Sequence, residues 1–240
     1  TNQTDARYLS IHPNSSSLIT ECWRSSPMDR NLCRSTLEEG GLVPTGLEGY
    51  DPAFSPDGTK IAWFASQPNF TGQDTQLVVL EDEQSQAEAA ENLIGWYAEY
   101  VWLPDSRSLI LKQNSEGNFC EIYRVVLGEA EPLLLARMEN CYPTWRMLDQ
   151  PSPSGDFIVY YYQNRAYIVD THGENPPVLA RAPQNAKLVW SPDGNLIALS
   201  LGKLAQWIDP KTGDASEITT DIPWRKISAL PLFIDYIYQT

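Results

Sequence analysis

The chain has 240 residues and carries a formal net charge of −14 at pH 7. An acidic surface disfavours binding to nucleic acid or to anionic lipid, because both of these partners need a basic surface. Aromatic residues make up 11% of the chain and charged residues 20%, a balance that is typical of a folded protein and not of a disordered one.

The sequence shows neither a membrane span nor a signal-peptide pattern. No apolar run reaches the length that a membrane-spanning helix needs, so no direct insertion into a membrane is expected. The chain begins at Thr1 and has no charged and apolar leader. We therefore expect that an N-terminal segment has been removed or lies outside this sequence.

A short motif of strand, four-residue turn and strand recurs along the chain, at residues 11–19, 54–63, 102–111, 153–160, 187–199 and 229–234. In the clearest copy, Ser191, Pro192 and Gly194 are the residue types that a type I turn prefers at its first, second and fourth positions. Gly194 can adopt the positive φ that returns the chain into the next strand. The turn prolines of the six copies are 39–49 residues apart, which is typical of one four-stranded blade per repeat.

Two further strands are predicted after each hairpin. Third strands are expected at residues 76–80, 121–126, 165–170 and 204–209, and fourth strands at 132–135, 177–180 and 216–219. One segment, Glu83–Glu91, has the composition of one or two helical turns between the third and fourth strands of the second repeat.

These repeats resemble those of the TolB-like β-propeller family, which centre on a strand-Ser-Pro-Asp-Gly-strand core, and the resemblance covers roughly residues 6–236. It implies an all-β fold, with a single β-propeller of four-stranded antiparallel blades as the only domain of residues 1–240. Five complete blades are expected near residues 6–47, 48–94, 95–140, 141–183 and 184–222, and a partial or degenerate sixth at 223–240. The fold says little about function, because propellers host many activities.

Four cysteines form two pairs that are close in the sequence, Cys22 with Cys33 and Cys120 with Cys141. Neither pair has CxxC spacing and the chain has only two histidines, so a metal site is not expected. The simplest hypothesis is two disulfides, which would place the protein in the periplasm, on the cell surface or in the extracellular medium. Four buried free thiols are the alternative.

The sequence contains no catalytic or cofactor-binding signature, since Gly-x-Ser-x-Gly, Gly-x-Gly-x-x-Gly and Walker motifs are all missing. We expect no cofactor. Asp57, Asp105 and Asp193 are explained by their places in the turns, where an aspartate accepts hydrogen bonds from the turn backbone.

Large aromatic residues with charged neighbours gather in four connections between the last strand of one repeat and the first strand of the next. Such connections lie on one face of a propeller, and Tyr, Trp and Arg are enriched in binding hot spots. Packing between blades is the alternative role for the tryptophans. The predicted binding residues are Tyr50, Asp51, Trp96, Tyr97, Glu99, Tyr100, Tyr142, Trp145, Arg146, Trp224 and Arg225.

We therefore expect a non-catalytic module outside the cytoplasm that binds a protein, a peptide or a glycan through this aromatic face, either alone or as a subunit of a larger surface assembly. The alternative is a propeller glycoside hydrolase or lyase that uses carboxylates at the propeller axis, with Asp51, Glu99 and Asp149 as candidates. The segment Phe233–Tyr238 is expected to pair through its strand edge with a partner or with a continuation of the chain.

Overall fold

The computed structural model describes residues 9–23, 30–38, 40–66, 75–80, 88–89, 96–115, 119–141, 148–180, 187–201 and 204–217. These ranges form nineteen β-strands and no helix. Among the described segments there is accordingly no helix that is long and apolar enough to cross a membrane.

The strands form antiparallel sheets in which neighbours in sequence are also neighbours in space. The first seven strands make one sheet, in the order β1 to β7, and this sheet consists of two four-stranded units that share β4. We call these units the first and second sheets. Their strands are β1 (Leu9–Ile11), β2 (Ser17–Trp23), β3 (Arg30–Thr36), β4 (Val43–Phe54), β5 (Ile61–Ser66), β6 (Thr75–Leu80) and β7 (Glu88–Ala89).

Three further four-stranded sheets follow. The third sheet contains β8 (Trp96–Trp102), β9 (Ser108–Ser115), β10 (Phe119–Val126) and β11 (Leu133–Met138). The fourth contains β12 (Leu148–Pro151), β13 (Phe157–Tyr162), β14 (Arg165–Asp170) and β15 (Val178–Leu179). The fifth contains β16 (Lys187–Trp190), β17 (Ile197–Leu201), β18 (Leu204–Ile208) and β19 (Ala215–Glu217).

Strand β4 joins the first two sheets because it changes partner halfway along its length. Its first half pairs with β3, and its second half, which begins at Gly49, pairs with β5. A Cβ atom on Gly49 would lie 2.2 Å from the carbonyl oxygen of Phe64 and 2.6 Å from Cδ1 of Trp63. Only glycine therefore fits where the strand passes from one sheet to the next.

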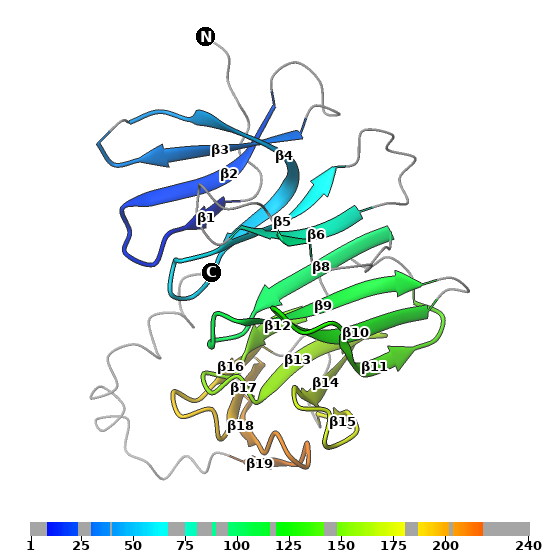
Figure 1. The fold of residues 1–240 in the computed structure, drawn as a ribbon. Helices are drawn as coiled ribbons and strands as arrows, with labels where there is room; N and C mark the ends of the chain where they lie inside the picture. Colours follow the sequence, from blue (N-terminus) through cyan, green and yellow to red (C-terminus); the bar gives the residue numbers. More distant parts are fainter. Residues whose placement is uncertain are drawn as a thin grey trace, which may run out of the picture.

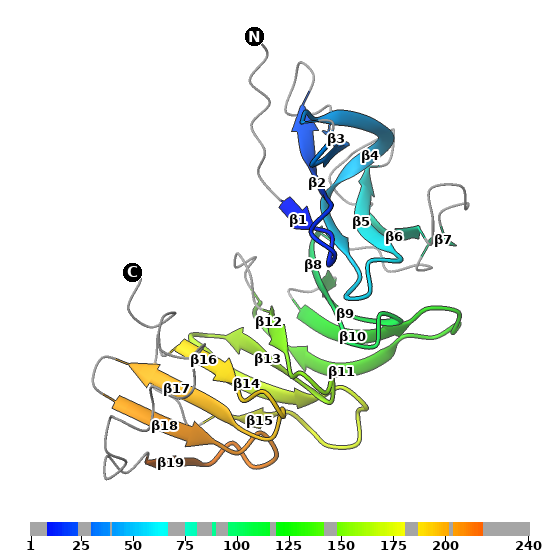
Figure 2. The ribbon, with the colours of Figure 1, turned by 90° about the vertical axis from the view of Figure 1, so that its left-hand side faces the viewer.

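The five sheets follow one another along a curved path, from the first two sheets at the top of Figure 1 to the fifth at the bottom. Figure 2 shows this path as an arc, with the first and fifth sheets at its opposite ends. The hydrophobic core lies between successive sheets. Between the second and third sheets, for example, Ala62, Phe64, Leu109 and Leu111 are all at most 1% exposed. Equivalent clusters fill the other three interfaces of the arc.

The predicted turn connects the first and second strands of every described sheet. In two copies the amide of the fourth turn residue donates to the carbonyl of the first at 2.9 Å, from Gly58 to Ser55 and from Gly194 to Ser191. The fourth residue has a positive φ in all five turns, where it is Ser15, Gly58, Ser106, Gly155 or Gly194. The turn prediction is thus confirmed for these five copies, including those in which serine replaces glycine, whereas the sixth, at residues 229–234, lies outside the described residues.

The turn aspartates accept hydrogen bonds from their own turns, as the sequence predicts. Oδ1 of Asp57 accepts from the Ser55 hydroxyl at 2.6 Å and from the Thr59 amide at 2.9 Å. Asp193 repeats this arrangement with Ser191 and Asn195. These carboxylates therefore hold the hairpins in shape.

Contacts between turns of neighbouring sheets continue around the arc. Nε2 of His12 lies 3.0 Å from the carbonyl oxygen of Gly58, and the amide of Asp57 donates to the Ser106 hydroxyl at 3.0 Å. Farther along, a Cβ atom on Gly194 would lie 3.2 Å from the hydroxyl of Ser154. The turns thus pack against each other as consecutive pairs on one side of the arc.

The predicted all-β fold and its four-stranded units are confirmed, and the predicted third strands coincide with β6, β10, β14 and β18. The helical turns expected within Glu83–Glu91 are wrong where the chain is described, because Glu88–Ala89 forms β7 and pairs with β6. The structure contains both predicted disulfides, Cys22–Cys33 and Cys120–Cys141. The segment Phe233–Tyr238 lies outside the described residues.

Replacing Asp57 by Asn should remove a stabilising contribution that depends on pH. The hydrogen bond from the Ser55 hydroxyl, supported by those from Thr59, lowers the pKa of Asp57 to about 2. The ionised carboxylate therefore contributes stability that is fully present above its unfolded pKa of about 3.9 and is lost as the pH falls through about 2.

We expect wild type to exceed Asp57→Asn in free energy of unfolding by about 0.5–1 kcal/mol near neutral pH, because the turn is exposed and its hydrogen bonds compete with water. Urea denaturation as a function of pH should show this difference shrinking below pH 4 (about the unfolded pKa). A difference that stays constant through the acidic range would contradict the role given to the carboxylate.

Candidate functional site

The described candidate binding residues lie in strands, at the start of the first strand of the second and third sheets. Tyr50 and Asp51 belong to β4, and Glu99 and Tyr100 belong to β8. The backbone of Trp96 and Tyr97 is also part of β8, but their side chains are outside the described residues, as are Tyr142, Trp145, Arg146, Trp224 and Arg225.

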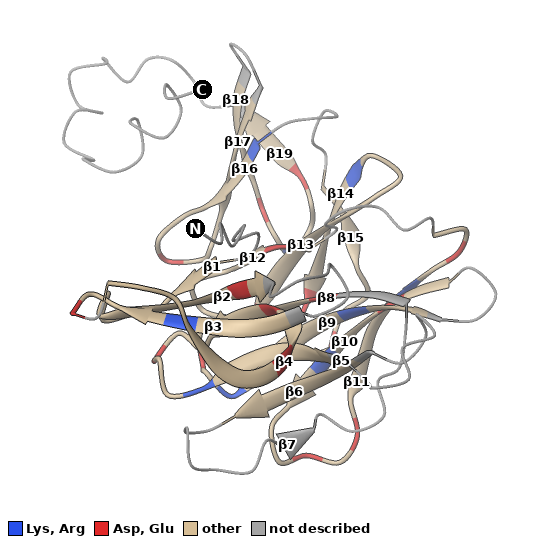
Figure 3. Ribbon diagram, turned by 90° about the horizontal axis from the view of Figure 1, so that it is seen from above, with Lys and Arg blue, Asp and Glu red and all other residues tan. Residues whose placement is uncertain are grey.

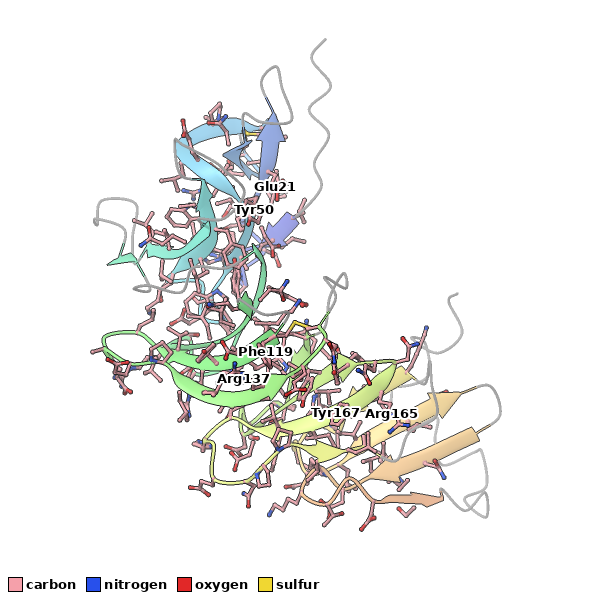
Figure 4. All side chains as sticks on the ribbon, turned by 90° about the vertical axis from the view of Figure 1, so that its right-hand side faces the viewer. Glu21, Tyr50, Phe119, Arg137, Arg165 and Tyr167 are labelled. Atoms are coloured by element: carbon pink, nitrogen blue, oxygen red, sulfur yellow. A yellow bond between two sulfur atoms is a disulfide. The ribbon has the colours of Figure 1, made fainter. Side chains whose placement is uncertain are left out.

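Glu21, on β2 of the first sheet, holds the backbone of Asp51 on the second sheet. Glu21 is only 3% exposed, and its Oε1 accepts a hydrogen bond from the Asp51 amide at 2.8 Å. Asp51 has a φ of 52°, a left-handed conformation that is uncommon for a residue other than glycine, and the register of β4 shifts at this point. Figure 4 shows Glu21 and Tyr50 beside each other where the two sheets meet.

Tyr100 continues this contact into the third sheet. Its hydroxyl donates to the carbonyl oxygen of Asp51 at 2.6 Å and to that of Ala62 at 2.7 Å, so the two acceptors share one proton. Burial, together with the charge of Asp51, raises the pKa of Tyr100 well above its ordinary value, so the hydroxyl remains a donor. Because Tyr100 is 9% exposed, its ring is occupied by packing between the sheets.

Glu99, next in the chain to Tyr100, lies opposite Lys112 in the β8–β9 pairing. Lys112 is 1% exposed, and this burial lowers its pKa while the charge of Glu99 opposes the shift. Oε1 of Glu99 also accepts a hydrogen bond from the Leu148 amide at 3.2 Å. Glu99 thus lies opposite the buried Lys112 of the third sheet and is bonded to the first strand of the fourth.

Asp149, the residue after Leu148, ends the described part of this arrangement. Its Oδ2 accepts a hydrogen bond from the Tyr161 hydroxyl of β13 at 3.0 Å. Burial, reinforced by the charge of Asp149 and by this bond, raises the pKa of Tyr161. A second tyrosine of β13, Tyr162, donates to the carbonyl oxygen of Glu139, just before Cys141.

These contacts form one line of polar groups across the first four sheets. We call it the cross-sheet network, and it consists of Glu21, Asp51, Glu99, Tyr100, Lys112, Asp149 and Tyr161. The sequence pointed to Asp51, Glu99, Tyr100 and Asp149 but missed Glu21, Lys112 and Tyr161. Lys112 directly follows the apolar run Leu109-Ile110-Leu111, and this position was a usable signal that it is buried. A buried charge in turn implies a partner, because charged residues are seldom fully buried without one.

The carboxylates of Glu21, Glu99 and Asp149 accept hydrogen bonds from amides or a tyrosine near the starts of the first strands. Within the described ranges, His, Cys, Asp and Glu form no group of three or more that could hold a metal ion. Lys and Arg positions of the described chain are distributed over several sheets and do not gather on one face (Figure 3).

The described fold is similar to that of solved TolB-like propellers. TolB from Acinetobacter baumannii superposes with a TM-score of 0.57 and 17% identity, over 88% of this chain and 53% of that one. A putative TolB from Agrobacterium tumefaciens superposes with a TM-score of 0.58 and 14% identity, over 90% of this chain and 81% of that one. The propeller domain of the Trilobed protease from Pyrococcus furiosus, described as having an open velcro topology, gives 0.60 and 15%, over 92% and 73%. The chain therefore has a TolB-like β-propeller fold.

Chemistry does not follow from this likeness. The chain spans about half the length of the Acinetobacter TolB, and an oligogalacturonate lyase in complex with manganese and an acylaminoacyl peptidase match the fold equally well. No protein-family model matches the chain, and no curated protein matches its sequence.

Lys112→Met should lower the free energy of unfolding by about 3 kcal/mol, because it leaves Glu99 beside an apolar side chain in a partly buried site. Glu99→Gln should be destabilising as well. The double variant should cost less than the sum of the two, with a coupling of about 1 kcal/mol or more in urea denaturation.

The matched control is the exposed pair of Arg107 and Glu129, whose charged atoms are 3.8 Å apart with side chains 64% and 59% exposed. Arg107→Met and Glu129→Gln should couple by less than about 0.5 kcal/mol. Equal coupling in the two pairs would show that Lys112 and Glu99 do not act on each other.

Proposed function

We propose that this chain is a non-catalytic binding or scaffold module that recognises a protein, a peptide or a glycan at the side of the arc where the first strands begin. The observation that carries the proposal is the cross-sheet network. It fastens four successive sheets to each other at the starts of their first strands, and in the sequence these starts follow the connections in which aromatic residues concentrate.

A rigid base under variable connections is the usual arrangement of binding proteins, because loops can change in sequence while the scaffold keeps them in place. Two of the anchors belong to the connection that carries Trp145. At its start, Cys141 is bonded to Cys120 of β10, and at its end the Leu148 amide is held by Glu99. Tyr, Trp and Arg on such a base can bury area with little loss of conformational entropy.

The compartment follows from the cysteines. Two disulfides favour an oxidising environment, and we infer a periplasmic, secreted or cell-surface protein from them. The proposal includes work as a subunit of a larger surface assembly. Pairing through the strand edge of Phe233–Tyr238 stays a prediction from the sequence, since this segment lies outside the described residues.

A propeller glycosidase or lyase is the second candidate function, because Asp51, Glu99 and Asp149 do line up along the starts of neighbouring inner strands. We rank it below binding because Glu99 already accepts the Leu148 amide and lies opposite Lys112, and Asp149 accepts the Tyr161 hydroxyl. A carboxylate with such a structural role is poorly placed to exchange protons with a substrate. Release of reducing sugar from a polysaccharide panel by wild type, lost in Glu99→Gln, would favour the enzyme.

The binding proposal is tested by affinity capture from the native extract, with the partners identified by mass spectrometry. Tyr50→Ala, Trp96→Ala, Tyr97→Ala and Trp145→Ala, combined in one bait, should reduce recovery of the specific partner by about tenfold or more, because hot-spot aromatics dominate binding energy. Glu129→Ala, on the opposite side of the third sheet, is the matched control and should capture as wild type does.

Thermal unfolding of each bait separates binding from folding. The proposal expects the four-residue variant to unfold cooperatively and to lose its partner. An unchanged partner list from a folded variant would contradict it, and a variant that no longer folds would instead assign these residues to packing between sheets.

A further inference from the structure

A groove of about 510 Å³ lies between the fourth and fifth sheets, at the opposite end of the strands from the cross-sheet network. Phe157, which lines it, begins β13, whereas Tyr161 of the network lies near the end of the same strand. The polar lining of the groove consists of Asp156, Asp170, His172, Glu174, Asn175 and Lys211, and five apolar side chains complete the lining. The volume falls in the range of sites that bind small ligands.

One wall of the groove is a turn organised by Asp170, which is only 8% exposed. The Asp170 carboxylate accepts hydrogen bonds from the amide of His172 at 2.8 Å and from Nδ2 of Asn175 at 3.0 Å, and Nδ1 of His172 lies 3.4 Å away. Thr171 fastens this turn to the neighbouring hairpin, since its hydroxyl donates to the carbonyl oxygen of Gly155 at 2.6 Å. The imidazole and the amide are thereby oriented before any ligand arrives.

The other wall is the turn after β18, which supplies Pro210 and Lys211. The Lys211 amide donates to Oδ1 of Asp209 at 2.8 Å, so this turn is also closed by its own aspartate. A Cβ atom on Gly213 would lie 2.3 Å from the carbonyl oxygen of Leu179. Glycine therefore lets the turn of the fifth sheet rest directly on the end of the fourth.

The lining combines hydrogen-bond donors and acceptors around an apolar floor. Lys211 and the Asn175 amide donate, Asp156 and Glu174 accept, and the His172 side chain, 47% exposed, can do either. Of the apolar lining, Pro176 is exposed and Phe157 and Val178 are partly exposed, whereas Ile168 and Pro210 are buried. A sugar ring needs this combination, because each hydroxyl both donates and accepts while the C–H face of the ring packs on apolar or aromatic surface.

We propose that the groove binds an uncharged glycan through one of its hexose units. Asp156, Asp170 and Glu174 outnumber Lys211, so the local charge is negative and disfavours uronic or sulfated sugars. Because the walls are already held by their own hydrogen bonds, binding costs little ordering of the protein. The site is independent of the proposed function, which uses the other end of the strands.

The test titrates the intact chain with maltotriose, cellotriose and tri-N-acetylchitotriose, and with trigalacturonate as the acidic comparison, by saturation-transfer NMR and calorimetry. At least one neutral trisaccharide should bind saturably, and more tightly than trigalacturonate. Glu174→Ala with Lys211→Ala should weaken that binding by about tenfold or more, because each removes a hydrogen bond that involves a charged group.

Arg107→Ala with Glu129→Ala is the matched control, because it removes the same two kinds of charge from exposed positions on the third sheet and should leave the affinity unchanged. Both double variants should melt as wild type does. The proposal is overturned if no neutral trisaccharide binds, if trigalacturonate binds best, or if the Glu174 and Lys211 variant binds as wild type does. Glycan binding that is lost only in the Trp145→Ala variant would overturn this groove and support the other face.

Discussion

The structure depends on the apolar interface that each sheet makes with the next. The positions that face the following sheet from the second strand are Ala62, Ile110 and Val159 in the second, third and fourth sheets, and all are at most 1% exposed. Interior sheets are therefore apolar on both faces, which is why their strands read as continuous apolar runs and not as an alternation. The ends of the arc differ. Leu9 and Ile11 of β1 are 54% and 59% exposed, and Val189 of β16 is 47% exposed.

Apolar packing does not by itself fix the orientation of one sheet relative to the next. The polar contacts at the two ends of the strands fix this orientation. At one end, hairpin turns touch in consecutive pairs, as in the bond from the Asp57 amide to the Ser106 hydroxyl. At the other end, buried carboxylates and tyrosines bridge the starts of the strands, as Glu21 does for Asp51. Directional bonds of this kind specify a register that dispersion contacts leave open.

Local features of the sequence predicted the fold because they repeat. The turn prolines gave the period, the apolar runs gave the strands, and the spacing of the cysteines gave the disulfides. The prediction that failed was the helical segment, where pairing with a neighbouring strand outweighed the local helix preference. Glu88 and Ala89 favour helix, yet they pair with Val79 and Val78 of β6, because an unpaired strand edge gains more from hydrogen bonds than a short helix gains from propensity.

The candidate site was predictable only in part, for a different physical reason. Its bonds join residues of separate repeats, 30 positions apart for Glu21 and Asp51 and 49 apart for Glu99 and Leu148. The second separation equals one repeat, but a repeat length does not show which side chain bonds to which backbone group, so the sequence showed the acids and the aromatics but not what they touch. Tyr100 illustrates the consequence. A tyrosine at this position suits a binding surface, yet its hydroxyl donates hydrogen bonds to two backbone carbonyls of the second sheet.

The structural roles of these residues limit the positions at which new function can arise in this fold. A side chain that bridges two sheets cannot be exchanged without disturbing an interface, so the cross-sheet network constrains its own residues. Connecting loops in general tolerate more sequence change than the elements they join. The groove between the fourth and fifth sheets follows the same logic. Asp170 and Gly213 shape the turns, while Glu174 and Lys211 extend from them and are exposed. In both proposed sites the buried polar residues determine geometry, and each proposal assigns recognition to the exposed residues that they hold in position.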